Sequence, residues 1–131
     1  MARSRAVPSR PSADAGPRRD LRLWLIDDTP QHHGVAEATA HRVGGIAFRG
    51  FLDGASGEAA FRRAQEDGSA PDVVLMDFFL GDDRGDAVTR RLRSQERGRR
   101  CTIIGYSSVT SGSEAIVAAG GDLILPKRRN D

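Results

Sequence analysis

Four short apolar runs of the 131-residue sequence end in side chains that could do chemistry. Asp27 and Asp28 follow "LWLI", Asp77 follows "VVLM", Ser107 follows "TIIGY" and Lys127 follows "LILP". Carboxylates held close together repel one another unless a cation lies among them, and small, hard Mg²⁺ suits two or three carboxylates with a backbone carbonyl and water. If the ends of these runs meet, the sequence predicts a metal-dependent acidic site with a hydroxyl and an ammonium beside it.

The elements that would position these residues alternate between two kinds. Short apolar runs predict strands at 21–26, 46–52, 72–76, 102–106 and 123–125. Amphipathic stretches between them predict helices at about 31–43, 56–67, 86–97 and 112–119. The first helix has Thr29 as its expected N-cap and Pro30 at its first position, and Gly44 and Gly45 end it.

This alternation predicts an α/β fold with a five-stranded, doubly wound parallel sheet. "VVLM" and "LIL" are continuously apolar, which is typical of strands buried on both faces. In such sheets ligands bind in the crevice at the carboxyl ends of the strands. The acidic residues, the hydroxyl and the ammonium all lie at such ends, so we expect them to converge.

Lys127 stands out by composition, because the chain has nineteen Arg and a single Lys. A lysine offers a compact ammonium that meets a carboxylate or phosphate oxygen as a point charge, which a planar guanidinium does not replace one for one. The alternative is chance, with Lys127 beginning the basic tail "KRRN".

Each of the other residues also has a purely structural interpretation. A single aspartate after a strand, such as Asp27 or Asp28, is most often a helix N-cap or a turn residue. Asp77 would then only form a turn before the expected loop "GDDRGD", and Ser107 would cap the fourth helix. The occurrence of all of them in order at successive strand ends favours the functional interpretation.

Together these segments resemble the receiver domains of bacterial two-component response regulators. The resemblance covers about residues 21–127 and rests on "IDD", "VVLMDFFLGDDRG", "IIGYSS" and "GGDLILPK" in this order. It implies a flavodoxin-like strand order 2-1-3-4-5 and a role for each matching residue. Asp77 resembles the phosphoacceptor, Asp27 and Asp28 the acidic pair at the metal, Ser107 the hydroxyl that meets the phosphoryl group and Lys127 its ion-pair partner. The Phe79 backbone carbonyl would complete the Mg²⁺ ligands.

The function that this resemblance implies is that of a single-domain response regulator. Asp77 would accept a phosphoryl group from a histidine kinase or phosphotransfer protein in the presence of Mg²⁺. No DNA-binding or catalytic domain follows in the sequence, so we expect the signal to pass to a downstream protein by contact. The chain would be no enzyme beyond catalysing its own phosphoryl transfer and hydrolysis.

The sequence departs from the family pattern in several places. Gly81 stands where the family usually has a proline, and the bulky Phe79 would overhang the phosphoryl group and slow attacking water. Ile124 replaces the switch aromatic of the fifth strand, with Tyr106 as an unsupported substitute. The sequence ends four residues after Lys127, so the family's fifth helix is missing, and we expect a homodimer or a partner protein to cover the apolar surface left open.

Composition and length bound the remaining alternatives. No apolar run approaches the roughly 20 residues of a membrane helix, so we expect a cytoplasmic protein. We expect a disordered basic tail at 1–20, one receiver domain at 21–127 and a short C-terminal tail at 128–131. The tail holds five of the Arg residues, which leaves 15 basic against 16 acidic residues in 21–131, so nucleic-acid binding is not expected.

Other classes of function match the sequence poorly. "GYSSV" lacks the closing glycine of the hydrolase motif G-x-S-x-G, and no phosphate-binding glycine motif of a nucleotide site occurs. His32, His33 and His41 do not have the spacing of a helical zinc pair and are expected on a solvated helix face. The serious alternative is a receiver-like interaction module that acts without phosphorylation.

Overall fold

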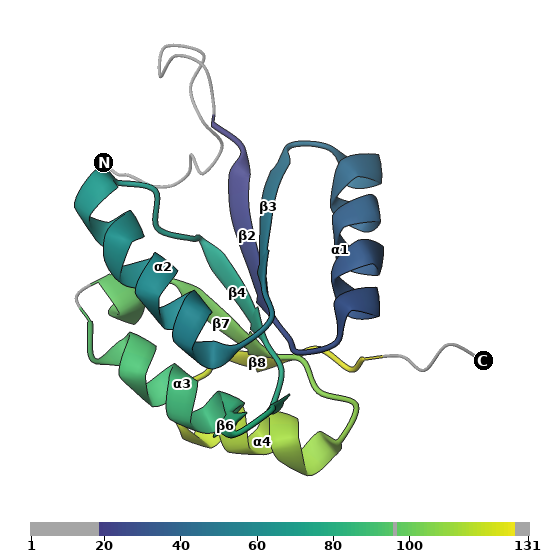
Figure 1. The fold of residues 1–131 in the computed structure, drawn as a ribbon, viewed down its shortest axis with the longest axis vertical. Helices are drawn as coiled ribbons and strands as arrows, with labels where there is room; N and C mark the ends of the chain where they lie inside the picture. Colours follow the sequence, from purple (N-terminus) through teal and green to yellow (C-terminus); the bar gives the residue numbers. More distant parts are fainter. Residues whose placement is uncertain (1–18, 96, 128–131) are drawn as a thin grey trace, which may run out of the picture.

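The computed structural model describes residues 19–95 and 97–127, which fold into three layers (Figure 1). The strands of the main sheet are β2 (Leu21–Ile26), β3 (Ile46–Phe51), β4 (Val73–Met76), β7 (Thr102–Gly105) and β8 (Leu123–Ile124). The helices are α1 (Pro30–Val43), α2 (Gly54–Asp67), α3 (Gly85–Arg93) and α4 (Thr110–Ala118), and a short 3₁₀ turn, η2, spans Arg97–Arg99. Every predicted strand and helix is present. The largest difference in bounds is at α3, which ends at Arg93 and not at residue 97 as predicted. The chain turns there into η2, and Gly98 of this turn lies directly against the Leu92 carbonyl.

The main sheet is parallel throughout, in the order β3-β2-β4-β7-β8. Numbered by the order of these five strands in the chain, this is 2-1-3-4-5, so the predicted fold class is confirmed. Parallel pairing places all five carboxyl ends at one edge of the sheet. The order puts β2 beside β4, so that the ends of these two strands are neighbours.

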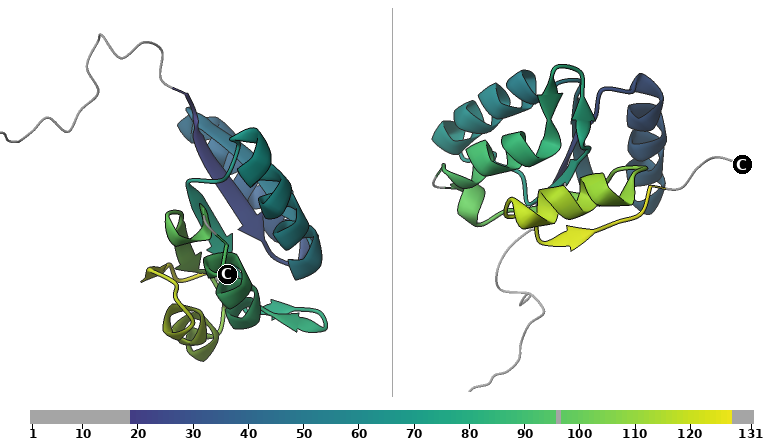
Figure 2. Two further views of the ribbon diagram at one scale, coloured as in Figure 1. Left: turned by 90° about the vertical axis from the view of Figure 1, so that its left-hand side faces the viewer. Right: turned by 90° about the horizontal axis from the view of Figure 1, so that it is seen from below.

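The main hydrophobic core lies between the sheet and the three helices α2, α3 and α4 (Figures 1 and 2). Trp24 is almost fully buried there and meets the rings of Phe51 and Phe61 at centroid distances of 4.8 and 6.2 Å. Val74, Met76 and Ile103 from the central strands belong to the same buried cluster. Aromatic and branched apolar side chains contribute most of the free energy of such a core, at about 25 cal/mol for each Å² buried.

The opposite face of the sheet is covered by α1 alone among the described helices (Figure 1). The register places Leu25, Leu75, Ile104 and Leu123 in one row across this face. Leu25 is fully buried, whereas Leu123 at the far end of the row is 57% exposed. The sequence leads us to expect part of both "LWLI" and "LIL" to be uncovered, but only the second is exposed, because Trp24, Leu25 and Ile26 are buried. A homodimer or partner protein that covers it stays a prediction.

The beginnings of α1 and α2 are set by different means. Thr29 precedes α1 in extended conformation as expected, but its side chain makes no capping hydrogen bond, so the helix begins mainly with Pro30. Asp53 caps α2 through a hydrogen bond from the Ser56 amide. The Asp53 carboxylate therefore serves the helix geometry.

The segment after Asp77 is more regular than the loop that the sequence predicts. Phe79–Leu80 (β5) and Asp83–Arg84 (β6) pair as a small antiparallel hairpin, with Gly81 in the turn at a φ of 73°. A positive φ costs glycine little, which explains this residue where proline was expected. The predicted loop "GDDRGD" is therefore wrong at Asp83 and Arg84, which form β6, and at Gly85 and Asp86, which begin α3.

Outside this core, the described residues reach two positions into the predicted N-terminal tail. Arg19 forms an ion pair with Asp72 at 2.8 Å, so the folded unit begins before Leu21. The rest of that tail, residues 1–18, and the predicted C-terminal tail, 128–131, lie outside the described residues. No helix among those described is long and apolar enough to cross a lipid bilayer.

Candidate functional site

The predicted acidic residues come together at the carboxyl edge of the sheet. Asp27 and Asp28 follow β2, and Asp77 follows the neighbouring strand β4. Carboxylate oxygens from all three lie within 4.8 Å of one another. Asp27 and Asp77 are buried while Asp28 is exposed, so the cluster opens to solvent on one side. Three carboxylates so close provide hard oxygen ligands, and a divalent cation that enters from the solvent side would offset their repulsion.

Lys127 reaches this cluster from the segment after β8. Its Nζ donates a hydrogen bond to Asp27 Oδ2 at 2.7 Å and lies 3.5 Å from Asp77 Oδ2. The lysine side chain is only 6% exposed, and that of Asp27 is fully buried. The one lysine of the chain is thus an ion-pair partner of both buried carboxylates, and the interpretation of Lys127 as the chance start of a basic tail is wrong.

The environments of Asp27 and Asp77 move their pKa values in opposite directions. Burial alone would raise the pKa of Asp27, but hydrogen bonds from Lys127, the Thr29 amide and His32 outweigh it and the pKa falls. Burial is also the largest influence on Asp77, and together with the negative charge of Asp27 it raises the pKa despite the attraction of Lys127. Asp27 is therefore firmly ionised, whereas the Asp77 carboxylate keeps more of its basicity.

The backbone around Asp77 leaves one carboxylate oxygen without a backbone partner. Asp77 Oδ1 accepts a hydrogen bond from the Phe78 amide at 2.8 Å, and Oδ2 faces Lys127. Gly85 lies so close to the Asp77 carbonyl oxygen that a Cβ at this position would collide with it. The start of α3 therefore packs tightly against the Asp77 backbone, and a side chain at position 85 would displace that backbone.

Sequence comparison leaves the chain without an identified relative. No family model matches it, and no curated protein matches it. Many solved structures match its fold, among them the receiver domain of a sensor histidine kinase from Pseudomonas aeruginosa, solved with a magnesium ion in its active-site cleft. That domain is 27% identical with a TM-score of 0.72, and the match covers 85% of this chain and 88% of that one.

Two further structures give the same result at lower identity. A phosphorylated cyanobacterial phytochrome response regulator is 19% identical with a TM-score of 0.71, over 85% of this chain and 83% of that one. A receiver domain from Methanospirillum hungatei is 17% identical with a TM-score of 0.69, over 85% and 84%. The chain has the fold of a response regulator receiver domain.

Within this receiver fold, Ser107 lies where the sequence predicts it, after β7, but its hydroxyl is engaged locally. Ser107 is buried, its Oγ accepts a hydrogen bond from the Val109 amide at 3.2 Å, and its own amide donates to Ser113 Oγ. Among the described contacts, Ser107 makes no hydrogen bond to Asp77. The structure thus places the hydroxyl in the neighbourhood of the acidic cluster without joining it to the carboxylates.

Phe79 and the fifth strand differ from the receiver pattern as the sequence indicates. The Phe79 ring is 52% exposed and meets Phe78 edge to face at 4.9 Å. Ile124, at the expected switch position, is aliphatic and 43% exposed. Tyr106 contacts the site through its ring, because Lys127 Nζ lies 4.8 Å from the ring centroid. This cation–π contact joins Tyr106 to the ammonium, which the sequence did not indicate.

Two histidines belong to the site although the sequence analysis placed them on a solvated helix face. His32 Nδ1 lies 2.9 and 3.1 Å from the two carboxylate oxygens of Asp27, and His33 Nε2 lies 2.6 Å from the Asp27 carbonyl oxygen. The expectation is wrong for these two residues because α1 begins at Pro30, which turns its first residues back over the end of β2. His32 and His33 follow Asp27 by five and six residues, and the predicted helix begins between them and Asp27. This spacing is the signal in the sequence that could have indicated the contact.

Proposed function

We propose that this chain is a phosphoacceptor of two-component signalling, with Asp77 as the residue that takes the phosphoryl group. The observation that carries the proposal is the cluster of Asp27, Asp28 and Asp77 within 4.8 Å, with Lys127 paired to both buried members. The receiver fold supports it. The donor would be a phosphohistidine of a histidine kinase or of a phosphotransfer protein.

The acidic cluster fits a Mg²⁺ ion by its chemistry. Three carboxylates beside a solvent opening suit a hard cation that keeps several water ligands. Asp27, Asp28, Asp77 and the Phe79 backbone carbonyl would hold the ion, and solved structures similar in fold are described with bound magnesium or manganese. When bound, Mg²⁺ would supply positive charge against the phosphoryl oxygens.

The transfer itself needs little covalent work from the protein. Asp77 Oδ2 would bond to phosphorus as the bond between phosphorus and the donor imidazole nitrogen breaks, and the neutral imidazole would leave. Oδ2 suits this role because Oδ1 already accepts the Phe78 amide proton. The raised pKa of Asp77, caused first by burial, also makes its carboxylate the better nucleophile of the buried pair.

Lys127 and Ser107 would act on the transferred group. The Lys127 ammonium, 3.5 Å from Asp77 Oδ2, is placed to pair with a phosphoryl oxygen on that atom. The Ser107 hydroxyl accepts the Val109 amide proton, so its own O–H would be available to donate to another phosphoryl oxygen once the segment after β7 moved toward it. That movement would give the segment two arrangements, and a downstream protein would bind one of them.

The alternative function is an interaction module that has the receiver fold and acts without phosphorylation. The local hydrogen bond of Ser107 and the aliphatic Ile124 are the observations that favour it. On this alternative, the arrangement after β7 would be fixed and the same partner would be bound at all times.

Binding of a phosphoryl mimic separates the two functions. Mg²⁺ and beryllium fluoride are added together to ¹⁵N-labelled protein, and the amide signals of Ser107 and Val109 are followed by NMR. We expect these signals to shift only when both additives are present, and not in Asp77→Asn. The matched control is Asp53→Asn, because asparagine also caps a helix and Asp53 lies outside the cluster. Unchanged signals in the wild type would support the interaction module.

A further inference from the structure

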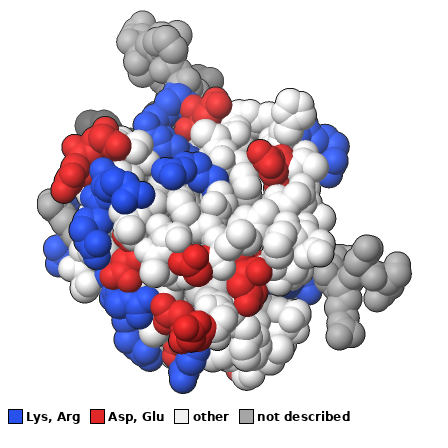
Figure 3. All heavy atoms as spheres, in the orientation of Figure 1, with Lys and Arg blue, Asp and Glu red and all other residues white. Residues whose placement is uncertain are grey.

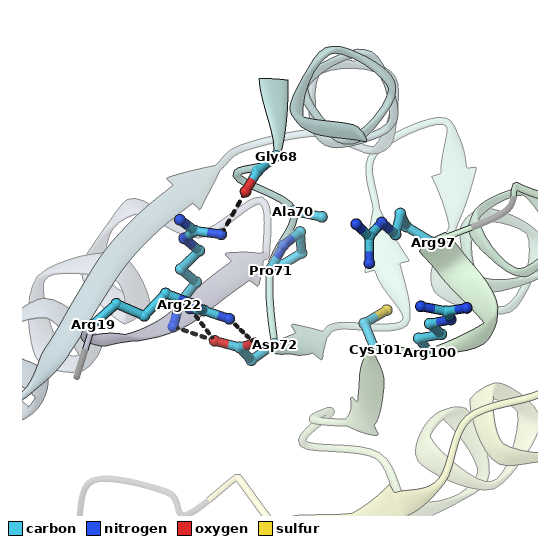
Figure 4. Close-up of a pocket in the computed structure, with 9 residues that line it drawn as sticks. All are labelled: Arg19, Arg22, Gly68, Ala70, Pro71, Asp72, Arg97, Arg100 and Cys101. Atoms are coloured by element: carbon cyan, nitrogen blue, oxygen red, sulfur yellow. Dashed lines mark hydrogen bonds and ion pairs between the residues drawn. The ribbon is translucent and has the colours of Figure 1, made fainter. Parts of the chain in front are cut away.

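The opposite edge of the sheet carries a second charged site, which the proposed function does not use. A cavity of about 390 Å³ lies where β2, β4 and β7 begin, so it is at the far end of these strands from Asp77 (Figure 4). Four arginines and one aspartate line it, together with Cys101 and three small or apolar residues. The charged residues are Arg19, Arg22, Asp72, Arg97 and Arg100.

Asp72, the one carboxylate among the described residues that line this cavity, is already occupied by protein donors. Both oxygens of Asp72 accept from the Arg19 guanidinium, at 2.8 and 2.9 Å, and Oδ2 also accepts from the Arg22 amide at 2.8 Å. The Arg22 guanidinium is directed to the Gly68 carbonyl, a neutral acceptor, at 2.8 Å. Of the four guanidinium charges, Asp72 can therefore offset only one.

Arg97 and Arg100 are the arginines with the fewest partners in this cavity. Both are exposed, and within 19–95 and 97–127 no ion pair involves either of them. The arginines of the neighbouring helix behave differently, because Arg91 pairs with Glu58 and Asp83, and Arg93 pairs with Asp122. In Figure 4 the Arg97 side chain points across the cavity toward Ala70 and Pro71.

The surface view agrees with this local excess of positive charge. Figure 3 shows basic side chains gathered over the start of β2, with acidic side chains at the border of this area. The chain as a whole is not strongly basic, with 20 basic against 18 acidic residues. Four arginines against one aspartate among the described lining residues is thus a local excess that the composition of the whole chain does not share.

We propose that this cavity binds a small soluble polyphosphate, either inorganic or the di- or triphosphate group of an organic molecule. The planar guanidinium presents paired donors that match phosphate oxygens, and several on one cavity favour more than one phosphate group. The volume lies within the range of small-ligand sites. None of the described residues that line the cavity is aromatic, so the phosphate groups and not a stacked base provide the recognition.

Pyrophosphate is the probe that tests this site. It is titrated into the full chain by calorimetry at low salt with a chelator present, so that no divalent cation assists binding at the acidic cluster. The test variant is Arg97→Gln/Arg100→Gln, and the matched control is Arg99→Gln, an exposed arginine of the same turn that does not line the cavity. We expect the double variant to bind at least about tenfold more weakly, because two guanidinium groups that would donate charge-assisted hydrogen bonds are lost. Arg99→Gln should stay within about twofold of the wild type.

Amide signals of the wild type give a second measurement that does not depend on any variant. Pyrophosphate should shift the signals of residues 68–72 and 97–101 and leave those of Asp77 and Ser107 unchanged. Orthophosphate should cause the same shifts only at higher concentration. An equal loss of binding in Arg99→Gln, shifts centred on Asp77, or no binding by the wild type would each overturn the proposal. Binding of duplex DNA without binding of pyrophosphate would also overturn it.

Discussion

The two ends of the same sheet carry opposite arrangements of charge. At the carboxyl end, one lysine pairs with the two buried members of a cluster of three carboxylates, and at the amino end four arginines and one aspartate line a cavity. The lysine is 6% exposed, while the side chains of Arg19 and Asp72 are 55% and 31% exposed. Burial therefore distinguishes the two ends, and removing a partner costs more for the buried charges Asp27, Asp77 and Lys127 than for the exposed ones.

The largest expected effect follows from removing the buried ammonium. Lys127→Met leaves Asp27 and Asp77 without their cation, and we expect the free energy of unfolding to fall by about 3–5 kcal/mol without divalent cations. Chemical denaturation measures it. The double variant Asp27→Asn/Lys127→Met should lose less stability than the sum of the two single changes, because Asp27 and Lys127 form an ion pair. Additive losses would show that the pair is not coupled.

A second change tests the metal at the carboxyl end. Asp28→Ala should weaken Mg²⁺ binding at least about tenfold, or about 1.4 kcal/mol, because it removes the solvent-facing carboxylate of the cluster. Calorimetric titration with Mg²⁺ gives the affinity. Asp53→Asn, which keeps the cap of α2, should bind like the wild type. If both variants bound Mg²⁺ with one affinity, the ion would have to lie elsewhere.

Neutralising Asp77 should raise the free energy of unfolding, whereas Lys127→Met should lower it. Its pKa is raised by burial and by Asp27, so the folded state holds its proton more tightly than the unfolded chain does. The stability that this group contributes is therefore present at low pH. It is lost as the pH rises from the pKa of the unfolded chain, near 3.9, through the pKa of the folded state. In chelator, Asp77→Asn should be more stable than the wild type at neutral pH, and the difference should shrink in acid. Thermal unfolding over a pH series checks this, and a less stable variant at neutral pH would contradict it.

The smallest effect on the free energy of unfolding is expected at the amino end of the sheet, at Asp72. The hydrogen bonds from Arg19 lower the pKa of Asp72, opposed by burial and helped by the Arg22 amide. A lowered carboxyl pKa contributes stability above the unfolded value, and this stability is lost as pH falls through the folded pKa. Asp72→Asn should therefore cost no more than about 1 kcal/mol at neutral pH, and nothing in strong acid. A pH-independent loss would assign the effect to the Arg22 amide contact alone.

The carboxyl end could be predicted from the sequence because its residues follow apolar runs directly. Asp27, Asp77 and Ser107 are fixed in place by the strands before them, and parallel pairing determines that these ends meet. The four helices could be predicted from the amphipathic stretches between these runs, whereas the strand order was implied only by the resemblance to receiver domains. The roles of His32 and His33 could not, because the direction of their side chains depends on how α1 begins after β2.

The amino end could not be predicted in the same way. Its arginines stand at positions 19, 22, 97 and 100, in segments that the fold brings together without any regular spacing in the sequence. Arg19 also lay in the part of the chain expected to be a disordered tail. A cavity lined by residues so far apart is a property of tertiary packing, and only the structure reveals it.

The measurement that tests the central claim most directly is the intact mass of the chain after incubation with a small acyl phosphate donor and Mg²⁺. Wild type and the control Asp53→Asn should each gain the mass of one phosphoryl group, and chelation of Mg²⁺ should prevent the gain. Asp77→Asn should gain none, because the accepting oxygen is then part of an amide. Equal labelling of Asp77→Asn and wild type, or no labelling of the wild type by this donor or by a phosphorylated histidine kinase, would contradict the account.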